Sequence, residues 1–104
     1  RGSGNARFKV MALSDYNNSA TYTFFNAKGI TSGEWRVPTH IELATFGGQL
    51  GITTSNYSGY GLKDRYWSSS ANSDYYSYCV NFSNGKIDSD YNYNFYPVRL
   101  ARTF

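Results

Sequence analysis

A strand pattern followed directly by a turn is the feature that most restricts how this chain can fold. Large apolar or aromatic side chains alternate with small or polar ones over residues 78–83, which read YCVNFS. A strand directs these two sets to opposite faces of a sheet. Asn84 and Gly85 follow, and this pair suits the positive φ of a tight hairpin turn. We therefore expect an antiparallel hairpin with a return strand from about Lys86 and a scaffold formed by Tyr78, Val80, Phe82, Gly85 and Ile87.

The rest of the chain predicts one helix and several more strands. Thr39, followed three residues later by Glu42, forms a capping box, so a helix is expected there, ended or broken by Gly47 and Gly48. Alternation and β-branched or aromatic content predict strands over residues 7–13, 21–25, 65–69 and 97–104, with one or two short ones within 52–64. The pattern predicts an α+β domain with a small antiparallel sheet.

Length and composition indicate one folded domain. A chain of 104 residues can bury roughly 60–70 % of its unfolded surface without disulfide bonds or metals. Aromatic residues make up 19 % and charged residues 16 %, the reverse of a disordered composition. Residues 1–4 are expected to be a remnant or the edge of a longer protein, which leaves residues 5–104 as the domain. The sequence contains no run of 18 apolar residues, so insertion of this domain into a membrane is not expected.

The scarcity of ligating and nucleophilic side chains excludes several kinds of site. Cys79 is the only cysteine and His40 the only histidine, so no internal disulfide, thiolate metal site or Ser-His-Asp triad is expected. We predict no catalytic residue, metal or cofactor. Residues 71–96 carry three aspartates against Lys86, a balance of −2 that leaves +5 on the rest. Because nucleic-acid binders place aromatic and basic groups on one face, nucleic-acid binding is not expected.

Residues 71–96, ANSDYYSYCVNFSNGKIDSDYNYNFY, have a biased composition. Six tyrosines, five asparagines, four serines and three aspartates account for 18 of the 26 residues. Tyrosine supplies a large amphipathic contact area with few torsions to immobilise, while serine and asparagine supply adaptable hydrogen bonds. The segment therefore has the composition of a recognition surface, although half-buried tyrosines and ordinary polar loops are the alternative interpretation.

Two motifs resemble those of a known family. The stretch GEWRVPTHIEL, residues 33–43, resembles the GWRLPT-x-x-E-L helix entry of bacterial C-type-lectin-like domains. The later stretch YWSSS…VNFSNGKI…YPVRLAR resembles the ending of the same domains. Motifs and spacing together span residues 33–102. The resemblance implies a C-type-lectin-like fold with small antiparallel sheets and one or two helices, in which Trp35 and Trp67 are core residues.

One subgroup matches more closely, the variable proteins of diversity-generating retroelements. In these proteins the final segment of a C-type-lectin fold is rewritten by adenine-specific mutagenesis, largely at AAC asparagine codons. Randomising both adenines of AAC never yields Lys, Glu, Gln, Met or Trp. Lys86 is the one residue of the segment 71–96 that lies outside the reachable set. The resemblance therefore implies that this segment is a variable, non-enzymatic binding surface.

The expected binding residues occupy the outward face of the hairpin and the adjoining segments. They are Asn72, Ser73, Asp74, Tyr75, Tyr76, Cys79, Asn81, Ser83, Asp88, Ser89, Asp90, Tyr91, Asn92, Tyr93, Asn94, Phe95 and Tyr96. The expected partner is a macromolecule, a protein or else a glycan. The domain itself is expected on a bacterial cell surface or a phage virion, with the cytoplasm left open.

Two other functions remain open at this stage. The first is an undiversified lectin-like adhesion domain that binds surface glycans. Calcium-dependent sugar binding is not expected, because Trp67-Ser68-Ser69 stands where calcium-binding lectins have Trp-Asn-Asp, and no Glu-Pro-Asn or Gln-Pro-Asp loop is present. The second is a hydrolase that uses Tyr and Asp residues in a cleft.

Overall fold

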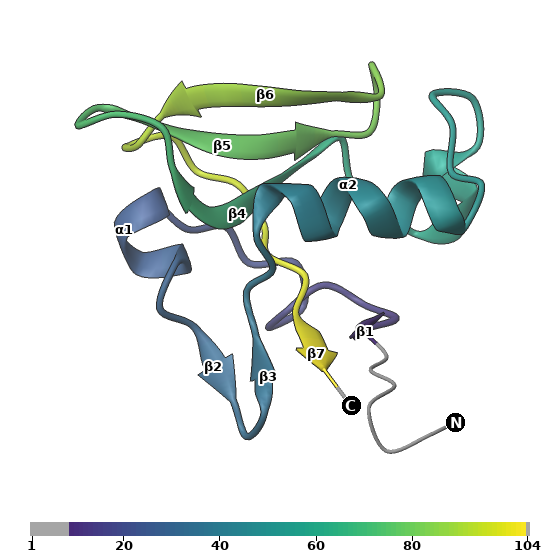
Figure 1. The fold of residues 1–104 in the computed structure, drawn as a ribbon, viewed down its shortest axis with the longest axis horizontal. Coiled ribbons are helices and arrows are strands. Elements are labelled where there is room, and N and C mark those ends of the chain that lie inside the picture. The colour runs from purple at the N-terminus through teal and green to yellow at the C-terminus, as the bar shows by residue number, and fades with distance from the viewer. Residues whose placement is uncertain (1–8, 104) are drawn as a thin grey trace.

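The computed structural model describes residues 9–103, which form an α+β domain with two antiparallel sheets and two α-helices (Figure 1). The expected remnant at residues 1–4 lies outside the described residues, as do residues 7 and 8 of the first predicted strand. The elements in chain order are β1 (Lys9–Met11), α1 (Phe24–Ala27), β2 (Thr31–Ser32), β3 (Trp35–Arg36), α2 (His40–Gln49), the 3-10 helix η1 (Tyr57–Tyr60), β4 (Arg65–Ala71), β5 (Tyr76–Asn81), β6 (Lys86–Tyr91) and β7 (Ala101–Thr103).

The two sheets divide the domain into a lower and an upper part in Figure 1. The first sheet has the order β1, β7, β3, β2, and the second has the order β4, β5, β6. The predicted hairpin is confirmed, since β5 pairs with β6 from Tyr76↔Tyr91 to Asn81↔Lys86. Gly85 in the turn has a φ of 72°, the left-handed conformation that glycine adopts without strain. The predicted α+β class with small antiparallel sheets is therefore confirmed.

Strand β5 is covered on both faces, which the alternating sequence pattern did not indicate. On one face Val80 packs in a cluster with Leu43 of α2 and with Phe82. On the other face Cys79 packs in a second cluster with Trp67 and Phe24. This sheet is therefore the middle layer of the domain, and its central strand has no solvent-facing side over most of its length.

Helix α2 begins where the sequence predicts. The Thr39 hydroxyl accepts from the Glu42 backbone amide at 3.1 Å, and the Glu42 carboxylate accepts from the Thr39 amide at 3.0 Å. The helix does not end at the predicted glycines but continues to Gln49. Gly47 lies under Phe82, where an added Cβ would come within 3.0 Å of that ring, so the glycine allows close packing rather than ending the helix.

Two predicted strand regions contain no strand, and a third strand is shorter than predicted. Residues 21–25 form no strand. Tyr22 makes only an isolated bridge, to Tyr96, and α1 begins at Phe24. The Phe24 ring packs edge-on against Trp67, with centroids 5.6 Å apart, so tertiary packing outweighs the strand preference of this sequence. The stretch 52–64 contains η1 and no strand, and of residues 97–103 only Ala101–Thr103 form a strand.

Glu42 ties three elements together, and its ionisation should be visible in acid unfolding. Hydrogen bonds from Arg36 lower the Glu42 pKa most; burial opposes this, but the Thr39 amide and Lys9 lower it further, to about 2 from an ordinary 4.5. The stabilisation is therefore complete above pH 4.5 and is lost as the pH falls toward 2. It amounts to up to about 3 kcal/mol.

We accordingly expect the free energy of unfolding to fall between about pH 5 and 2, and Glu42→Gln to remove much of that dependence. Urea unfolding at a series of pH values measures it. Glu34→Gln, at a far more exposed carboxylate, is the matched control and should keep the wild-type profile. Parallel pH profiles for wild type and Glu42→Gln would contradict this account.

Candidate functional site

A row of exposed aromatic rings crosses one end of the domain. Ring centroids are 6.2 Å apart for Tyr76 and Tyr91, 5.2 Å for Tyr91 and Tyr93, and 5.3 Å for Tyr93 and Phe25. We call Phe25, Tyr76, Tyr91 and Tyr93 the aromatic strip. Its members are between 42 % and 56 % exposed. The strip runs from the open end of the β5–β6 hairpin, where β5 begins and β6 ends, to α1, and these parts lie at the same end of the molecule in Figure 1.

Two further aromatic side chains flank the strip. Tyr75, in the loop before β5, is 65 % exposed, and Phe95, in the segment after β6, is 64 % exposed. Isolated exposed apolar residues are normal, but a connected group of large rings is the usual mark of an interaction surface. The predicted site residues Asn72, Ser73, Asp74 and Asn94 are also exposed at this end.

Asn92 holds this surface together from beneath. Its side-chain oxygen accepts from the Ser77 hydroxyl at 2.6 Å, and its amide nitrogen donates to the Asp74 carbonyl at 3.2 Å. Its backbone amide donates to the Tyr75 carbonyl, while its own carbonyl accepts from the Phe24 amide. A single residue thus fixes the loop before β5, the segment after β6 and the start of α1 relative to one another.

Asn92→Ala should therefore destabilise the domain although it removes no apolar contact. It leaves the buried Ser77 hydroxyl without its acceptor and removes two side-chain hydrogen bonds, a loss of about 2–3 kcal/mol. Thermal and urea unfolding measure the change. Asn72→Ala, at an exposed asparagine of the same surface, should stay within about 0.5 kcal/mol. Equal stability of the two variants would show that Asn92 does not have this role.

Three predicted binding residues are buried, and their expected exposure is wrong. Cys79 is 0 % exposed, Asn92 2 % and Asn81 6 %. The reason is that β5 is covered on both faces and that Asn92 turns inward to bond with Ser77. Burial raises the pKa of the Cys79 thiol to about 12, so it is protonated at neutral pH.

The scaffold residues mostly lie where they were expected. Val80, Phe82 and Trp67 are buried, while Trp35 is half-buried against the core. Tyr78 is half-buried and stacks on His40, with ring centroids 4.1 Å apart. Ile87 pairs with Val80 and shares its face of the sheet, as expected, but on the edge strand β6 it is 43 % exposed and so is not a core residue.

The remaining predicted residues centre on Arg65 rather than on the strip. Arg65 lies 2.5 Å from Asp90 and 3.6 Å from Asp88, and Tyr96 also donates to Asp90. Burial alone raises the Asp90 pKa, but the hydrogen bonds from Tyr96 and from the Tyr91 amide, with the Arg65 charge, bring it below its usual value. Asp90 is therefore ionised at neutral pH and paired with Arg65 within the domain. Ser89, by contrast, is exposed on β6.

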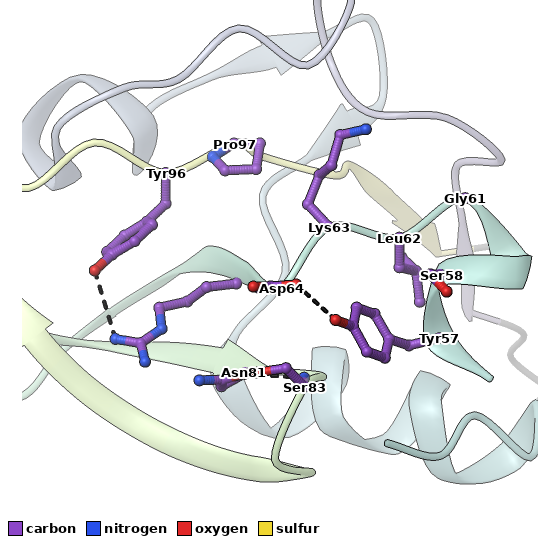
Figure 2. A pocket seen from close by; sticks show the side chains of 11 residues that line it. Tyr57, Ser58, Gly61, Leu62, Lys63, Asp64, Asn81, Ser83, Tyr96 and Pro97 are labelled. Atoms are coloured by element: carbon purple, nitrogen blue, oxygen red, sulfur yellow. Dashed lines mark hydrogen bonds between the residues drawn. The ribbon is translucent and has the colours of Figure 1, made fainter. Parts of the chain in front are cut away.

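A groove of about 850 Å³ lies beside this polar network. Figure 2 shows Tyr57 and Asp64 on one wall, where the tyrosine hydroxyl donates to the carboxylate at 2.7 Å. Asn81 and Ser83, both predicted site residues, also line the groove on the neighbouring strand and turn, and Tyr96 lies at one end. Ser83 is at the turn end of the β5–β6 hairpin, so the predicted residues form two separate surfaces.

Sequence reasoning missed the contribution of regions outside residues 71–96. Nothing in the sequence marks Phe25 as a surface residue, because phenylalanine is common in strands and a strand was predicted there. Tyr57 and Asp64 stand in a stretch predicted to be a loop with one or two short strands. Only the fold brings these residues to the surfaces that residues 71–96 supply.

No group of three or more potential metal-ligating side chains occurs among residues 9–103. No helix in that range is long and apolar enough to cross a membrane. Among known proteins, no family model matches the chain and no curated protein matches it significantly.

Proposed function

We propose that this chain is a non-enzymatic ligand-binding domain, the C-type-lectin-like part of a variable protein diversified by a retroelement. The aromatic strip is the observation that carries the proposal. Three of its four rings come from the segment 71–96, whose residues other than Lys86 are all reachable from an AAC codon. The ligand is a macromolecule, with a protein favoured because tyrosine-rich surfaces with serine and asparagine suit protein recognition.

The separation of exposed from buried residues supports this proposal. Tyr75, Tyr91, Tyr93 and Phe95 are exposed and make few contacts that the fold requires, whereas Val80 and Phe82 in the same segment are buried. Variation at the exposed positions would alter the surface without altering the core. The buried Cys79, Asn81 and Asn92 restrict the freely variable set to fewer positions than residue type alone suggests.

The coding neighbourhood of the gene tests the diversification directly. We expect a near-copy of the sequence that encodes residues 71–96, differing at adenines, together with a gene for a reverse transcriptase. Absence of both would refute diversification and leave an ordinary binding domain.

Substitutions in the strip test the binding role. Tyr91→Ala and Tyr93→Ala should weaken binding to a cell-surface partner by about 30-fold or more, as expected for aromatic anchors worth about 2 kcal/mol. Stability should stay within about 1 kcal/mol, because both rings are exposed. Titration calorimetry and urea unfolding measure the two effects. Unchanged binding in both variants would place the binding surface elsewhere.

Glycan binding by an undiversified adhesion domain is the alternative. Trp67 cannot stack on a sugar, because it is fully buried and its indole nitrogen donates to the Tyr22 carbonyl. A glycan array probed with wild type and with Tyr93→Ala separates the two functions. Saturable glycan binding that is lost in this variant would favour the adhesion domain.

A further inference from the structure

The groove beside the polar network has two walls of different origin. Tyr57, Lys63 and Asp64 lie outside the segment 71–96, whereas Asn81, Ser83 and Tyr96 lie inside it. If the segment varies as proposed, one wall stays constant while the other changes. The volume of about 850 Å³ lies in the range of ligand-binding clefts, roughly 300–1,000 Å³.

The Asn81 side chain offers an unused donor in this groove. Its Oδ1 accepts from the Ser83 amide at 2.9 Å and from the Ser83 hydroxyl, which assigns the other end of the group as the nitrogen. Within residues 9–103 no recorded hydrogen bond uses that Nδ2, although the residue is only 6 % exposed. In Figure 2 the nitrogen points away from Ser83. This nitrogen is not among the buried side-chain atoms that lack a partner, so solvent reaches it, and a ligand that accepts its hydrogen bond would take the place of water there.

Asp64, on the segment that pairs with the strand carrying Asn81, offers an acceptor. Only Oδ1 of Asp64 takes the Tyr57 hydroxyl, which leaves its second oxygen open to a donor. An amide donor and a carboxylate acceptor in one groove lining match the carbonyl and the N–H of a peptide main chain. The rings of Tyr57 and Tyr96 and the Pro97 ring supply apolar surface for side chains.

The charge around the groove favours an uncharged ligand. Arg65 is already neutralised by Asp88 and Asp90. Lys63 and Asp64, which carry opposite charges, are the other ionised residues that line the groove. Lys63 and Asp64 give the lining one charge of each sign, so it carries no excess of either sign that would select a ligand with a strong net charge.

We propose that this groove binds a short, extended and uncharged peptide segment of the protein partner, whose main chain is held by Asn81 and Asp64. The inference rests on the proposed function, and it assigns a second contact region separate from the aromatic strip. Asp64 and Asn81, the latter restricted in its variation by burial, would recognise main-chain groups that any protein offers, while Ser83 and Tyr96 would select among side chains.

A titration of the isotope-labelled domain with acetyl-Gly-Ser-Ala-Gly-Tyr-amide, followed by NMR, tests the proposal. We expect saturable shifts of the Asn81 side-chain amide and of the backbone amides of Lys63 and Ser83, with smaller shifts in the aromatic strip. Replacing the central alanine of the peptide by lysine or glutamate should weaken binding at least threefold. No saturable shift in the groove, or shifts confined to the strip, would overturn the proposal.

Variants make the test specific. Asn81→Asp keeps the acceptor for Ser83 but removes the donor, and it should weaken peptide binding at least tenfold. Asn84→Asp adds the same charge in the adjacent turn, outside the groove lining, and should leave binding unchanged. Asp64→Asn, at an exposed position, gives a second variant with little risk to folding and should weaken binding at least threefold.

Two further results distinguish the possible failures. Maltotriose that shifts the groove resonances when the peptide does not would overturn the choice of a peptide and indicate a sugar site. If partner binding still depends on Tyr93 while Asn81→Asp has no effect on it or on peptide binding, the groove proposal fails and the proposed function stands.

Discussion

Arg99→Met should lower the free energy of unfolding by about 3–5 kcal/mol, because it leaves a buried carboxylate without its counter-charge. The side chains of Arg99 and Asp15 are only 5 % and 2 % exposed, and Nη2 and Nε of Arg99 lie 2.8 and 3.0 Å from Oδ1 of Asp15. The Tyr66 and Ser19 hydroxyls also donate to this carboxylate. Burial alone would raise the Asp15 pKa, but these hydrogen bonds and the Arg99 charge lower it.

The Arg99 guanidinium also holds two loops to the core. It donates to the carbonyl of Ala12, which directly follows β1, and to the carbonyl of Gly61, which directly follows η1. Urea unfolding of Arg99→Met measures the loss, with Lys86→Met at an exposed cation as the control, expected within about 0.5 kcal/mol. The double variant Asp15→Ala, Arg99→Met should cost less than the sum of the two single changes. Additive losses would show that the pair does not act as a unit.

Local signals in the sequence predicted those parts of the fold that depend on local chemistry. The Thr39–Glu42 capping box and the Asn84-Gly85 turn each need only a few neighbouring residues, and both occur as predicted. The strand expected over residues 21–25 depends instead on distant groups. Phe24 takes its place under Trp67 and beside Asn92, which are more than 40 residues away, so no local pattern could indicate α1.

The candidate site could be predicted in part for the same reason. Strand periodicity predicts that Cys79 and Asn81 face one side of β5 and Val80 the other. The structure confirms this, since Cys79 and Val80 belong to different core clusters. It cannot show whether the second side is covered. Packing of α1 and of the chain near Val98 covers that side and buries Cys79. Exposure of Tyr91, Tyr93 and Phe95 was predicted correctly, because these residues lie at the end of β6 and in the following turn.

Burial inside the segment 71–96 limits what diversification can do. An AAC codon at position 79 could produce tyrosine, yet the Cys79 side chain is fully enclosed by Trp67, Phe24 and Val98. Asn81 and Asn92 are limited in a different way, because their side-chain oxygens accept specific hydrogen bonds. The proposed function therefore requires one of two things at these three positions. Either their codons do not vary, or many of the protein variants changed there fail to fold.

Cys79→Tyr should accordingly lower the free energy of unfolding by about 3 kcal/mol or more, at or above the usual range for overpacked cores. Ser89→Tyr is the matched comparison, since it introduces the same side chain on the neighbouring strand β6 at an exposed position opposite Tyr78. Tyrosine suits a strand surface, so that variant should stay within about 1 kcal/mol of the wild type. Urea unfolding and the near-ultraviolet circular dichroism of both variants measure the difference. If Cys79→Tyr is as stable as Ser89→Tyr, the core around Trp67 can be repacked, and position 79 can belong to the variable surface after all.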